Sequence, residues 1–295
     1  MTSADIANNR ENFCYRHPSK QSFVLCQRCL RTVCADCQTQ APVGVICPEC
    51  LKAQRKAESP AQRRARRQSA NVASMFAGRP PVVTTSIVAI TGFLGLLQLI
   101  PVFGDQIREA LLFYTPWLYP AFSGVSEPWR LVTSMLAHGG LLHLSLNMLA
   151  LYVIGRSLET MLGRWRFLAL YVISGIGGSV AVALLAPLTP VVGASGAIFG
   201  LFGALLVIGR KAGANMTGIL VILGINLVIG FIPGFHIAWQ AHIGGAVVGA
   251  VIALIYLRTA RPNQRRMQVL LLIALLAVLA AVLIFLVPAL IYARL

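Results

Sequence analysis

Polar and apolar positions divide the chain into two unlike parts. Residues 1–80 are polar and basic, whereas the sequence from Val82 onward is a series of long apolar runs with little charge. Such runs predict membrane-spanning helices, because about 20 apolar residues cross the hydrocarbon core of a bilayer. The expected spans are 82–102, 136–155, 166–187, 195–209, 216–232, 238–257 and 268–292.

This pattern predicts an all-α polytopic membrane protein that is preceded by a small soluble domain. The expected parts are a Cys-rich domain at 1–52, a basic linker at 53–81, a six-helix core at 82–258, and a basic loop with a seventh helix at 259–295. Nothing at the N-terminus has the pattern of a cleavable signal peptide, since the first apolar run comes too late. The first span is therefore expected to act as the insertion signal.

The distribution of charge sets the expected orientation. The chain has 25 Lys and Arg against 9 Asp and Glu, which gives a net charge of +16. With the N-terminus inside, the outer side of the expected topology keeps only Arg108, Arg130 and Arg294. Because cytoplasmic loops are enriched in Lys and Arg, we expect a multi-pass protein of the plasma membrane with a cytoplasmic N-terminus and an external C-terminus.

Metal-ligand pairs recur along the N-terminal domain. Seven Cys and one His form four pairs with C-x-x-C or C-x-x-H spacing: Cys14 with His17, Cys26 with Cys29, Cys34 with Cys37, and Cys47 with Cys50. Eight ligands are the number that two tetrahedral zinc ions need, and four ligands per ion favour a structural site over a catalytic one. So short a segment cannot build a large core, so we expect zinc to supply its folding energy.

Disulfides and a thioredoxin-like redox pair are the competing interpretations of these cysteines. A reducing cytoplasm argues against disulfides, and the odd number of Cys is explained once His17 is the eighth ligand. The spacing resembles that of B-box zinc fingers, which implies that alternate pairs share an ion, although sequential pairing stays open on spacing alone. Such a domain is a docking or regulatory module with a possible protein partner.

The linker carries a basic cluster at Arg63, Arg64, Arg66 and Arg67. A solvated tether is the simplest interpretation, and contact with the anionic headgroups of membrane lipids is a modest extension of it. Nucleic-acid binding ranks low, because no aromatic platform or recognition helix accompanies these arginines.

A serine and a histidine lie at matching depth in two of the expected spans. Ser195 stands fifteen residues before Arg210, about 22 Å along a helix, and His242 stands sixteen residues before Arg258, about 24 Å. A lone serine in a membrane helix is usually a packing or hydrogen-bonding residue. A serine and a histidine at one depth instead make a nucleophile and its general base, as acyl transfer requires.

No acid is available to complete a catalytic triad. Past residue 80 the only acids are Asp105, Glu109, Glu127 and Glu159, of which the first three fall in the outer loop and the last on the inner side. The predicted catalytic site is therefore a dyad, in which packing orients the histidine.

Small residues flank both members of this dyad. Gly193 and Gly196 surround Ser195 where its span begins, so backbone N–H groups without helical acceptors can face a developing oxyanion. Gly245 and Gly249 lie on the same helical face as His242, where they allow the two helices to approach closely.

Two polar residues near the outer end of the second span complete the predicted site. His143 and Asn147 are four residues apart and share a helical face, so their N–H groups are expected to complete an oxyanion hole. A polar contact between neighbouring helices is the alternative. His138 is expected to point away from this face and to have a structural role.

Together these motifs resemble the rhomboid family of intramembrane serine proteases. The resemblance covers about 82–258 and rests on "GASG" with Ser195, "AHIGG" with His242, "HLSLN" with His143 and Asn147, the outer-loop "WR", and "GRSLETMLGRWRFLALY". It implies a six-helix rhomboid core that cleaves single-span membrane proteins without a catalytic cofactor. In it Ser195 attacks the peptide bond, His242 is the general base, and His143, Asn147 and the Ser195 backbone N–H stabilise the oxyanion.

The sequence departs from the family pattern in two ways. Phe199 stands where family members often carry a Tyr that stacks on the catalytic histidine, so the ring is kept and the hydroxyl is lost. The seventh helix and the zinc-binding domain are additions to the basic core.

Two other functions compete with the protease. One is a catalytically silent rhomboid-fold protein that binds or remodels membrane proteins, and the intact Ser195 and His242 count against it. The other is a transporter with proton-relaying histidines, which predicts acidic partners within the spans, and the sequence places none there.

Overall fold

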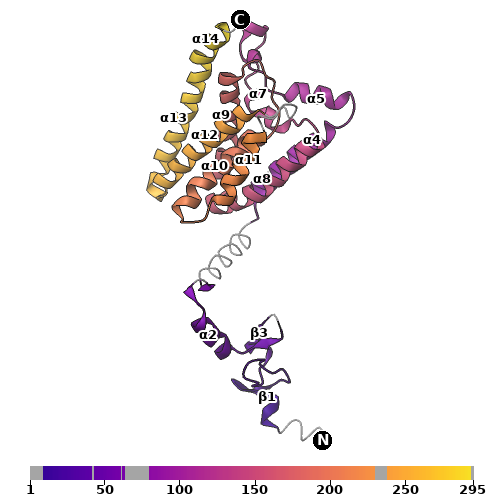
Figure 1. Ribbon diagram of the computed structural model, residues 1–295, viewed down its shortest axis with the longest axis vertical. Helices are drawn as coiled ribbons and strands as arrows, with labels where there is room; N and C mark the ends of the chain where they lie inside the picture. The colour runs from indigo at the N-terminus through magenta and orange to yellow at the C-terminus, as the bar shows by residue number, and fades with distance from the viewer. Residues whose placement is uncertain (1–8, 42, 61, 64–79, 230–237, 294–295) are drawn as a thin grey trace. The chain divides into compact units, whose positions relative to one another are not determined.

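The computed structural model describes residues 9–41, 43–60, 62–63, 80–229 and 238–293 (Figure 1). The chain divides into two compact units, a Cys-rich unit at 1–74 and a helical unit at 75–295. Of the four arginines in the linker cluster, Arg63 is described, and the other three lie outside the described residues.

Short strands and single helical turns build the Cys-rich unit. β1 (Phe13–Cys14) pairs antiparallel with β2 (His17–Gln21), and β3 (Thr39–Gln40) pairs antiparallel with β4 (Val45–Ile46). The turns η1 (Arg10–Asn12) and η2 (Ala35–Cys37) come before the longer helix α2 (Pro48–Ala57), which runs on past residue 52. Five cysteines, Val33 and Val45 form the buried core of this unit. So small an apolar core cannot hold a fold by itself.

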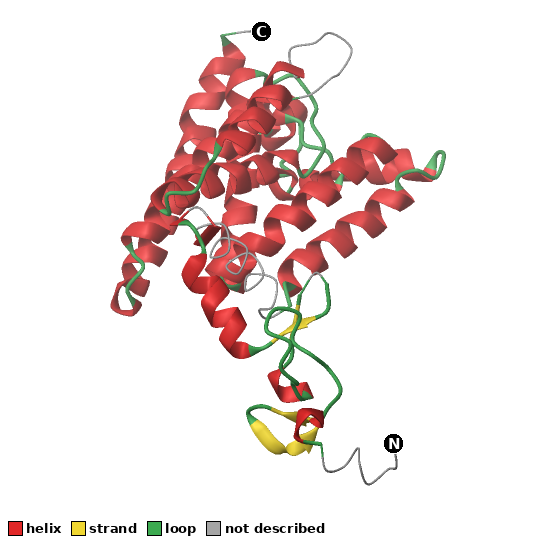
Figure 2. Cartoon of the chain, turned by 60° about the horizontal axis from the view of Figure 1, so that its bottom comes forward, coloured by secondary structure: helices red, strands yellow, loops and turns green. Residues whose placement is uncertain are grey.

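The described part of the helical unit is built from helices and helical turns. The four named strands, yellow in Figure 2, all belong to the Cys-rich unit. The helices are α4 (Val82–Leu97), α5 (Phe103–Leu111), α6 (Pro120–Ser123), α7 (Arg130–Thr133), α8 (Leu141–Leu162), α9 (Arg164–Leu185), α10 (Ser195–Lys211), α11 (Thr217–Ile229), α12 (Trp239–Arg258), α13 (Arg265–Ala281) and α14 (Val287–Tyr292). The turns η3 (Thr115–Leu118), η4 (Ser134–Leu136) and η5 (Pro262–Gln264) and the π-helical η6 (Val282–Leu286) connect them.

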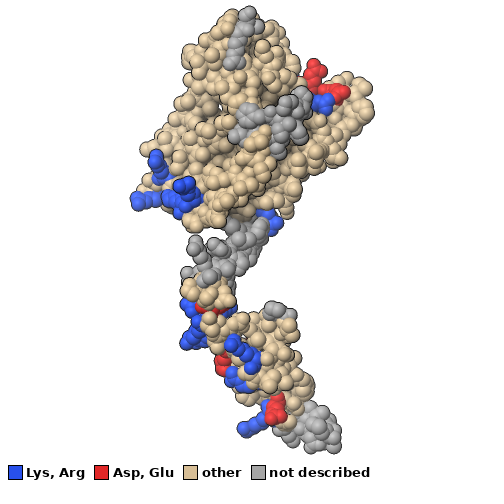
Figure 3. Space-filling view, viewed as in Figure 1, with Lys and Arg blue, Asp and Glu red and all other residues tan. Residues whose placement is uncertain are grey.

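Four of the described helices are long and apolar enough to cross a membrane: α8, α9, α12 and the continuous helix Pro262–Tyr292. α4, α10 and α11 occupy the other expected spans but are shorter, so their crossing stays a prediction, and the expected end of the fifth span lies outside the described residues. On the face that Figure 3 presents, the charged side chains of this unit gather at its ends, with an uncharged band between them.

The start of the second expected span is wrong. The apolar pattern predicts a span at 136–155, but α8 begins at Leu141, because residues 134–136 form a 3-10 turn and Gly140 interrupts the helical backbone with a φ of 152°. A φ in this range is open to glycine and strained for other residues. His138 therefore lies in the segment before the helix, where helical spacing does not set its direction.

Three helices that pack against one another form the centre of the helical unit: α9, α10 and α12. Phe167 and Leu170 of α9, Leu201 of α10 and Ile252 of α12 are fully buried. Because lipid is as apolar as these side chains, close packing and internal hydrogen bonds must hold the helices together. Two of these helices carry the predicted dyad, with Ser195 on α10 and His242 on α12.

A buried carboxylate caps the start of α4. Glu159 of α8 accepts hydrogen bonds from the backbone N–H groups of Val83 at 2.9 Å and Thr84 at 2.7 Å, and from the Thr84 hydroxyl at 2.8 Å. First-turn N–H groups have no helical acceptor, and a negative charge complements the helix dipole there. Glu159 thus ties α4 to α8 at the end of the unit opposite the predicted site.

Replacing Glu159 with alanine is expected to lower the free energy of unfolding by about 2–4 kcal/mol, because three donors, two of them buried, lose their acceptor. Thermal unfolding of the purified protein in detergent measures this loss. Glu109→Ala is the control, since Glu109 is exposed on α5. Equal melting temperatures for the two variants would contradict the cap.

Candidate active site and metal ligands

Ser195 is the first residue of α10, and the backbone before it is shaped by glycine. Gly193 has a φ of 123°, and its N–H donates to the carbonyl of Ser134 at 2.9 Å. The first i to i+4 hydrogen bond of α10 runs from the Ile198 N–H to the Ala194 carbonyl at 3.0 Å. The N–H groups of Ser195 and Gly196 therefore precede the helical ladder and are suited to receive an anion.

His242 lies in the first turn of α12 and is buried, with 5% of its surface exposed. The ring of Phe199 stacks on the imidazole, with the ring centroids 3.9 Å apart and an interplanar angle of 7°. Phe199 is four residues after Ser195 on α10, so the helix that carries the serine also supplies the aromatic face for the histidine. Nδ1 of His242 has no hydrogen-bond partner among the described residues.

Glycines bring the two helices into backbone contact. A Cβ added to Gly245 would lie 1.9 Å from the carbonyl oxygen of Gly196, and one added to Gly249 would lie 2.0 Å from the carbonyl oxygen of Gly200. α12 thus packs on α10 at a distance that side chains would prevent. The sequence predicts Gly196, Gly245 and Gly249 beside the dyad, and the structure places all three in this one contact.

No hydrogen bond joins Ser195 to His242 among the described residues. Catalytic hydrogen bonds are often long in the absence of substrate and tighten only when it binds. The stacked Phe199 ring and the glycine contact leave His242 little freedom to move away from the start of α10.

His143 presents one edge of its ring to Gly193, two residues before Ser195. The Gly139 N–H donates to Nδ1 of His143 at 3.4 Å, so a neutral ring carries its proton on Nε2. A Cβ added to Gly193 would lie 2.9 Å from this Nε2 and 3.7 Å from the Ser195 hydroxyl oxygen. The N–H of the imidazole therefore faces the same small space as the serine hydroxyl.

Asn147 is buried one helical turn after His143. One of its side-chain N–H groups donates to the His143 carbonyl at 3.0 Å, which holds the amide on the face that His143 occupies. An Asn amide has a second N–H. The structure thus places His143 on this side of Ser195 and Asn147 beside it, while their role at an oxyanion stays a prediction.

Sequence reasoning missed the position of His138. It is 2% exposed, and its ring centroid lies 5.1 Å from that of His143. Its backbone N–H donates to the side-chain oxygen of Gln98 at 2.8 Å, which ties this segment to the end of α4. The signal that could have found it is the Gly139–Gly140 pair, because two glycines argue against helix between His138 and His143.

The Cys-rich unit gathers its eight candidate ligands into two groups of four. One is Cys14, His17, Cys34 and Cys37, the other is Cys26, Cys29, Cys47 and Cys50, and within each group the ligand atoms lie within 4.8 Å of one another. Alternate pairs therefore come together, as in the B-box resemblance. All seven cysteines are free thiols, which excludes the disulfide interpretation for this structure.

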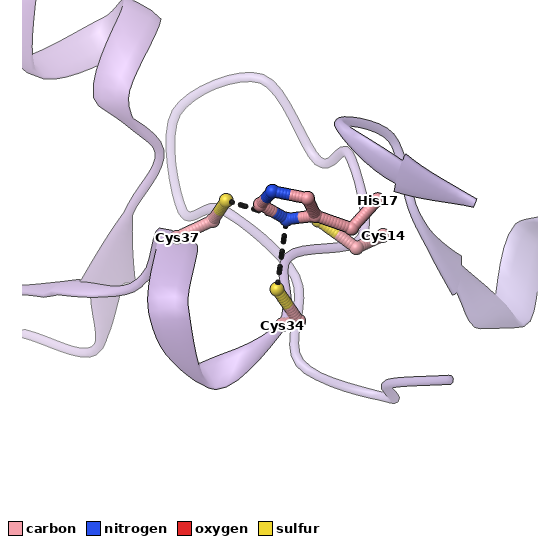
Figure 4. A group of neighbouring side chains, drawn as sticks. All are labelled: Cys14, His17, Cys34 and Cys37. Carbon is pink, nitrogen blue, oxygen red and sulfur yellow. Dashed lines mark hydrogen bonds between the residues drawn. The ribbon is translucent and has the colours of Figure 1, made fainter. Parts of the chain in front are cut away.

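Figure 4 shows the first group, in which the His17 ring points among the sulfurs. Its Nδ1 lies 3.3 Å from the Cys34 sulfur, 3.4 Å from that of Cys37 and 3.9 Å from that of Cys14. Three sulfurs around one ring nitrogen are the donor set of a Cys₃His zinc site.

The second group surrounds the start of α2. Sulfurs bound at about 2.3 Å to one tetrahedral zinc lie about 3.8 Å apart, and the sulfurs of Cys29 and Cys47 are 3.7 Å apart. Cys47 precedes the first residue of α2, and its sulfur accepts from the Cys50 N–H at 3.4 Å. A helix N-terminus favours thiolates, so this placement suits a Cys₄ cation site.

The thiols of the two groups differ in acidity. Burial opposes their ionisation, but backbone N–H groups that donate to the sulfurs lower the pKa of Cys14 and of Cys26 to about 6. Burial and neighbouring sulfurs raise the pKa of Cys37 to about 11 and that of Cys50 to about 12. A cation among these sulfurs would favour the thiolate form of the thiols whose pKa is raised.

Comparison with known proteins gives one consistent family. The rhomboid domain model matches residues 125–259, which include Ser195, His242, His143 and Asn147. RHOMBOID-like protein 5 of Arabidopsis thaliana is 43% identical over 141 residues, 44% of this chain and 45% of that protein. Rhomboid protease GluP of Bacillus subtilis (strain 168) is 42% identical over 156 residues, 50% of this chain and 30% of that protein.

A third relative is covered along most of its length. Rhomboid protease AarA of Providencia stuartii is 31% identical over 212 residues, 62% of this chain and 74% of that protein. This chain thus spans less than half of the two relatives named before and about three quarters of AarA. With its apolar helices, the match identifies an integral membrane protein. The chain belongs to the rhomboid family.

Proposed function

We propose that this chain is an intramembrane serine endopeptidase that cleaves transmembrane proteins with a Ser195–His242 dyad. The observation that carries the proposal is the glycine contact of α10 with α12, which sets His242 against Phe199 just beyond the start of the serine helix. Two of the named relatives are called rhomboid proteases, which supports the same reaction.

In this proposal Ser195 attacks the substrate carbonyl while His242 accepts its proton and later gives it to the leaving amine. In place of a carboxylate, the stacked Phe199 ring and the close packing of α12 on α10 orient the imidazole. The oxyanion is stabilised by the backbone N–H of Ser195, the Nε2–H of His143 and the free N–H of Asn147. Removing one such donor from a protease typically costs about 10²–10³ in kcat.

The proposed substrates are single-span membrane proteins, cut in or near the bilayer. We place the protein in the plasma membrane with the N-terminus in the cytoplasm, on the bias of Lys and Arg toward the loops on that side. The basic linker would then face anionic lipid headgroups of the inner leaflet.

Covalent labelling with a fluorescent fluorophosphonate tests the dyad. We expect the wild-type protein in detergent to be labelled, and Ser195→Ala and His242→Ala to remain unlabelled, because the probe reacts only with an activated serine. Ser145→Ala is the matched control, since Ser145 is exposed on α8 outside the site. Labelling that persists in Ser195→Ala would remove the nucleophile assignment, and an unlabelled wild-type protein would favour the catalytically silent alternative.

We further propose that the Cys-rich unit binds two structural zinc ions, one in each group of four ligands. The support is the donor set and the ligand spacing in each group. Four protein ligands would fill the tetrahedral coordination of each ion, so zinc would fold the unit and leave its surface for a protein partner.

A further inference from the structure

The seventh helix is interrupted where its own sequence removes a hydrogen bond. Between α13 and α14 lies the π-helical segment Val282–Leu286, in which the Val287 N–H donates to the Val282 carbonyl. In this i to i+5 pattern the next acceptor, the Leu283 carbonyl, would need the N–H of residue 288. Residue 288 is Pro288, which has no N–H.

The carbonyl that is left without a helical donor is satisfied from another part of the chain. The hydroxyl of Tyr119, between η3 and α6, donates to the Leu283 carbonyl at 2.6 Å. Close by, the ring of Phe122 packs on that of Tyr292 in α14, with centroids 4.7 Å apart. An unsatisfied carbonyl is costly at a membrane-buried position, so this bond holds the outer loop on the seventh helix.

The same outer loop is bonded to the segment that leads into Ser195. Phe113, which is fully buried, exchanges two backbone hydrogen bonds with Val191, at 2.9 Å and 2.8 Å. Two residues later the Gly193 N–H is held by the Ser134 carbonyl, and Ser195 then begins α10. One side-chain hydrogen bond, from Tyr119 to Leu283, and the backbone hydrogen bonds of Phe113 and Gly193 therefore link the seventh helix through residues 113–119 to the residues just before the serine.

We propose that the seventh helix positions Ser195 through this outer loop, with Tyr119 as the positioning residue. The inference rests on the proposed protease function, because it assigns Ser195 as the nucleophile. Tyr119 does not touch the reacting atoms. It fixes the loop whose Phe113 bonds to Val191. The position of Val191 in turn sets the path of residues 192–194 and therefore the position of Ser195.

Tyr119→Phe tests this role, since it removes the hydroxyl and keeps the ring. We expect the second-order rate of fluorophosphonate labelling at Ser195 and the kcat on a transmembrane substrate to fall about 3- to 30-fold, with KM little changed, because small misplacement of a reacting group lowers the chemical step. Tyr114→Phe is the matched control in the same loop. Its ring packs on Trp117, and its hydroxyl has no hydrogen bond among the described residues.

A second readout does not need activity. Amide hydrogen exchange of the full chain in detergent should speed up in Tyr119→Phe at 113–123 and 186–194, and should be unchanged in Tyr114→Phe. Pro288→Ala supplies an N–H that competes for the Leu283 carbonyl, so in that background Tyr119→Phe should change labelling and exchange less than it does in the wild type.

The outcomes separate this inference from the function on which it rests. An unlabelled wild-type protein would remove the protease proposal, while faster exchange at 186–194 in Tyr119→Phe would still support the bond through the outer loop. Wild-type labelling rates and unchanged exchange in Tyr119→Phe would overturn the inference and leave the protease proposal intact. Effects of equal size in Tyr119→Phe and Tyr114→Phe would also overturn it.

Discussion

Replacing Gly245 with alanine is expected to destroy the packing of α12 on α10 and, with it, both stability and labelling of Ser195. The added Cβ would lie 1.9 Å from the carbonyl oxygen of Gly196, and neither atom belongs to a flexible side chain that can move aside. Ordinary overpacking costs about 1–3 kcal/mol, and we expect at least the upper end of this range because two backbones must separate. Thermal unfolding in detergent and fluorophosphonate labelling measure the two losses.

The chain offers a matched control for this substitution. Gly92 in α4 has open space where a Cβ would point, so Gly92→Ala is expected to be neutral or to stabilise the protein by about 0.5–1 kcal/mol, as alanine does in helices. If Gly245→Ala melts at the wild-type temperature and is labelled at the wild-type rate, the close contact of the two helices is not what positions His242.

Removal of zinc is expected to unfold the Cys-rich unit completely. Its buried core is mostly cysteine, so little apolar burial remains once the ions are gone. We expect metal analysis of the full chain to give two zinc ions, and a chelator to release both and expose all seven thiols to a thiol reagent. Labelling of Ser195 is the control, because the helical unit contains no Cys. Thiols that stay protected after complete metal removal would contradict the structural role.

Two double variants separate the ways of pairing the ligands. If alternate pairs share an ion, Cys14→Ser with Cys34→Ser removes one zinc, and Cys14→Ser with Cys26→Ser removes both. Sequential pairing gives the reverse result. The structure predicts the first outcome, since it places Cys14 and Cys34 in the same group.

Acidification is expected to release the zinc. The folded arrangement of the thiols raises the pKa of Cys37 to about 11 and that of Cys50 to about 12, so zinc must displace protons from both at neutral pH. Affinity therefore falls as the pH falls. Below about pH 6 the thiols of Cys14 and Cys26 are protonated as well, and the loss steepens. Zinc content after dialysis across this pH range measures the effect.

Much of the candidate site follows from local sequence rules. Depth along a helix is set by a constant rise per residue, so the distances of Ser195 and His242 from their basic helix ends could be compared without a structure. Helical spacing likewise put Gly245 and Gly249 on the face of His242. The same rule failed for His138, because two glycines end the regular backbone on which the rule depends.

The sequence by itself determined the apolar runs, the bias of charge, the eight candidate metal ligands and the chemical identity of the serine and the histidine. Those properties depend on composition and on periodicity along a single segment. Only the tertiary structure decided which ligand pairs meet, that Phe199 lies flat on His242, and that Tyr119 bonds to Leu283. These contacts join residues whose separation in sequence carries no fixed distance in space, so they depend on how the helices and strands pack.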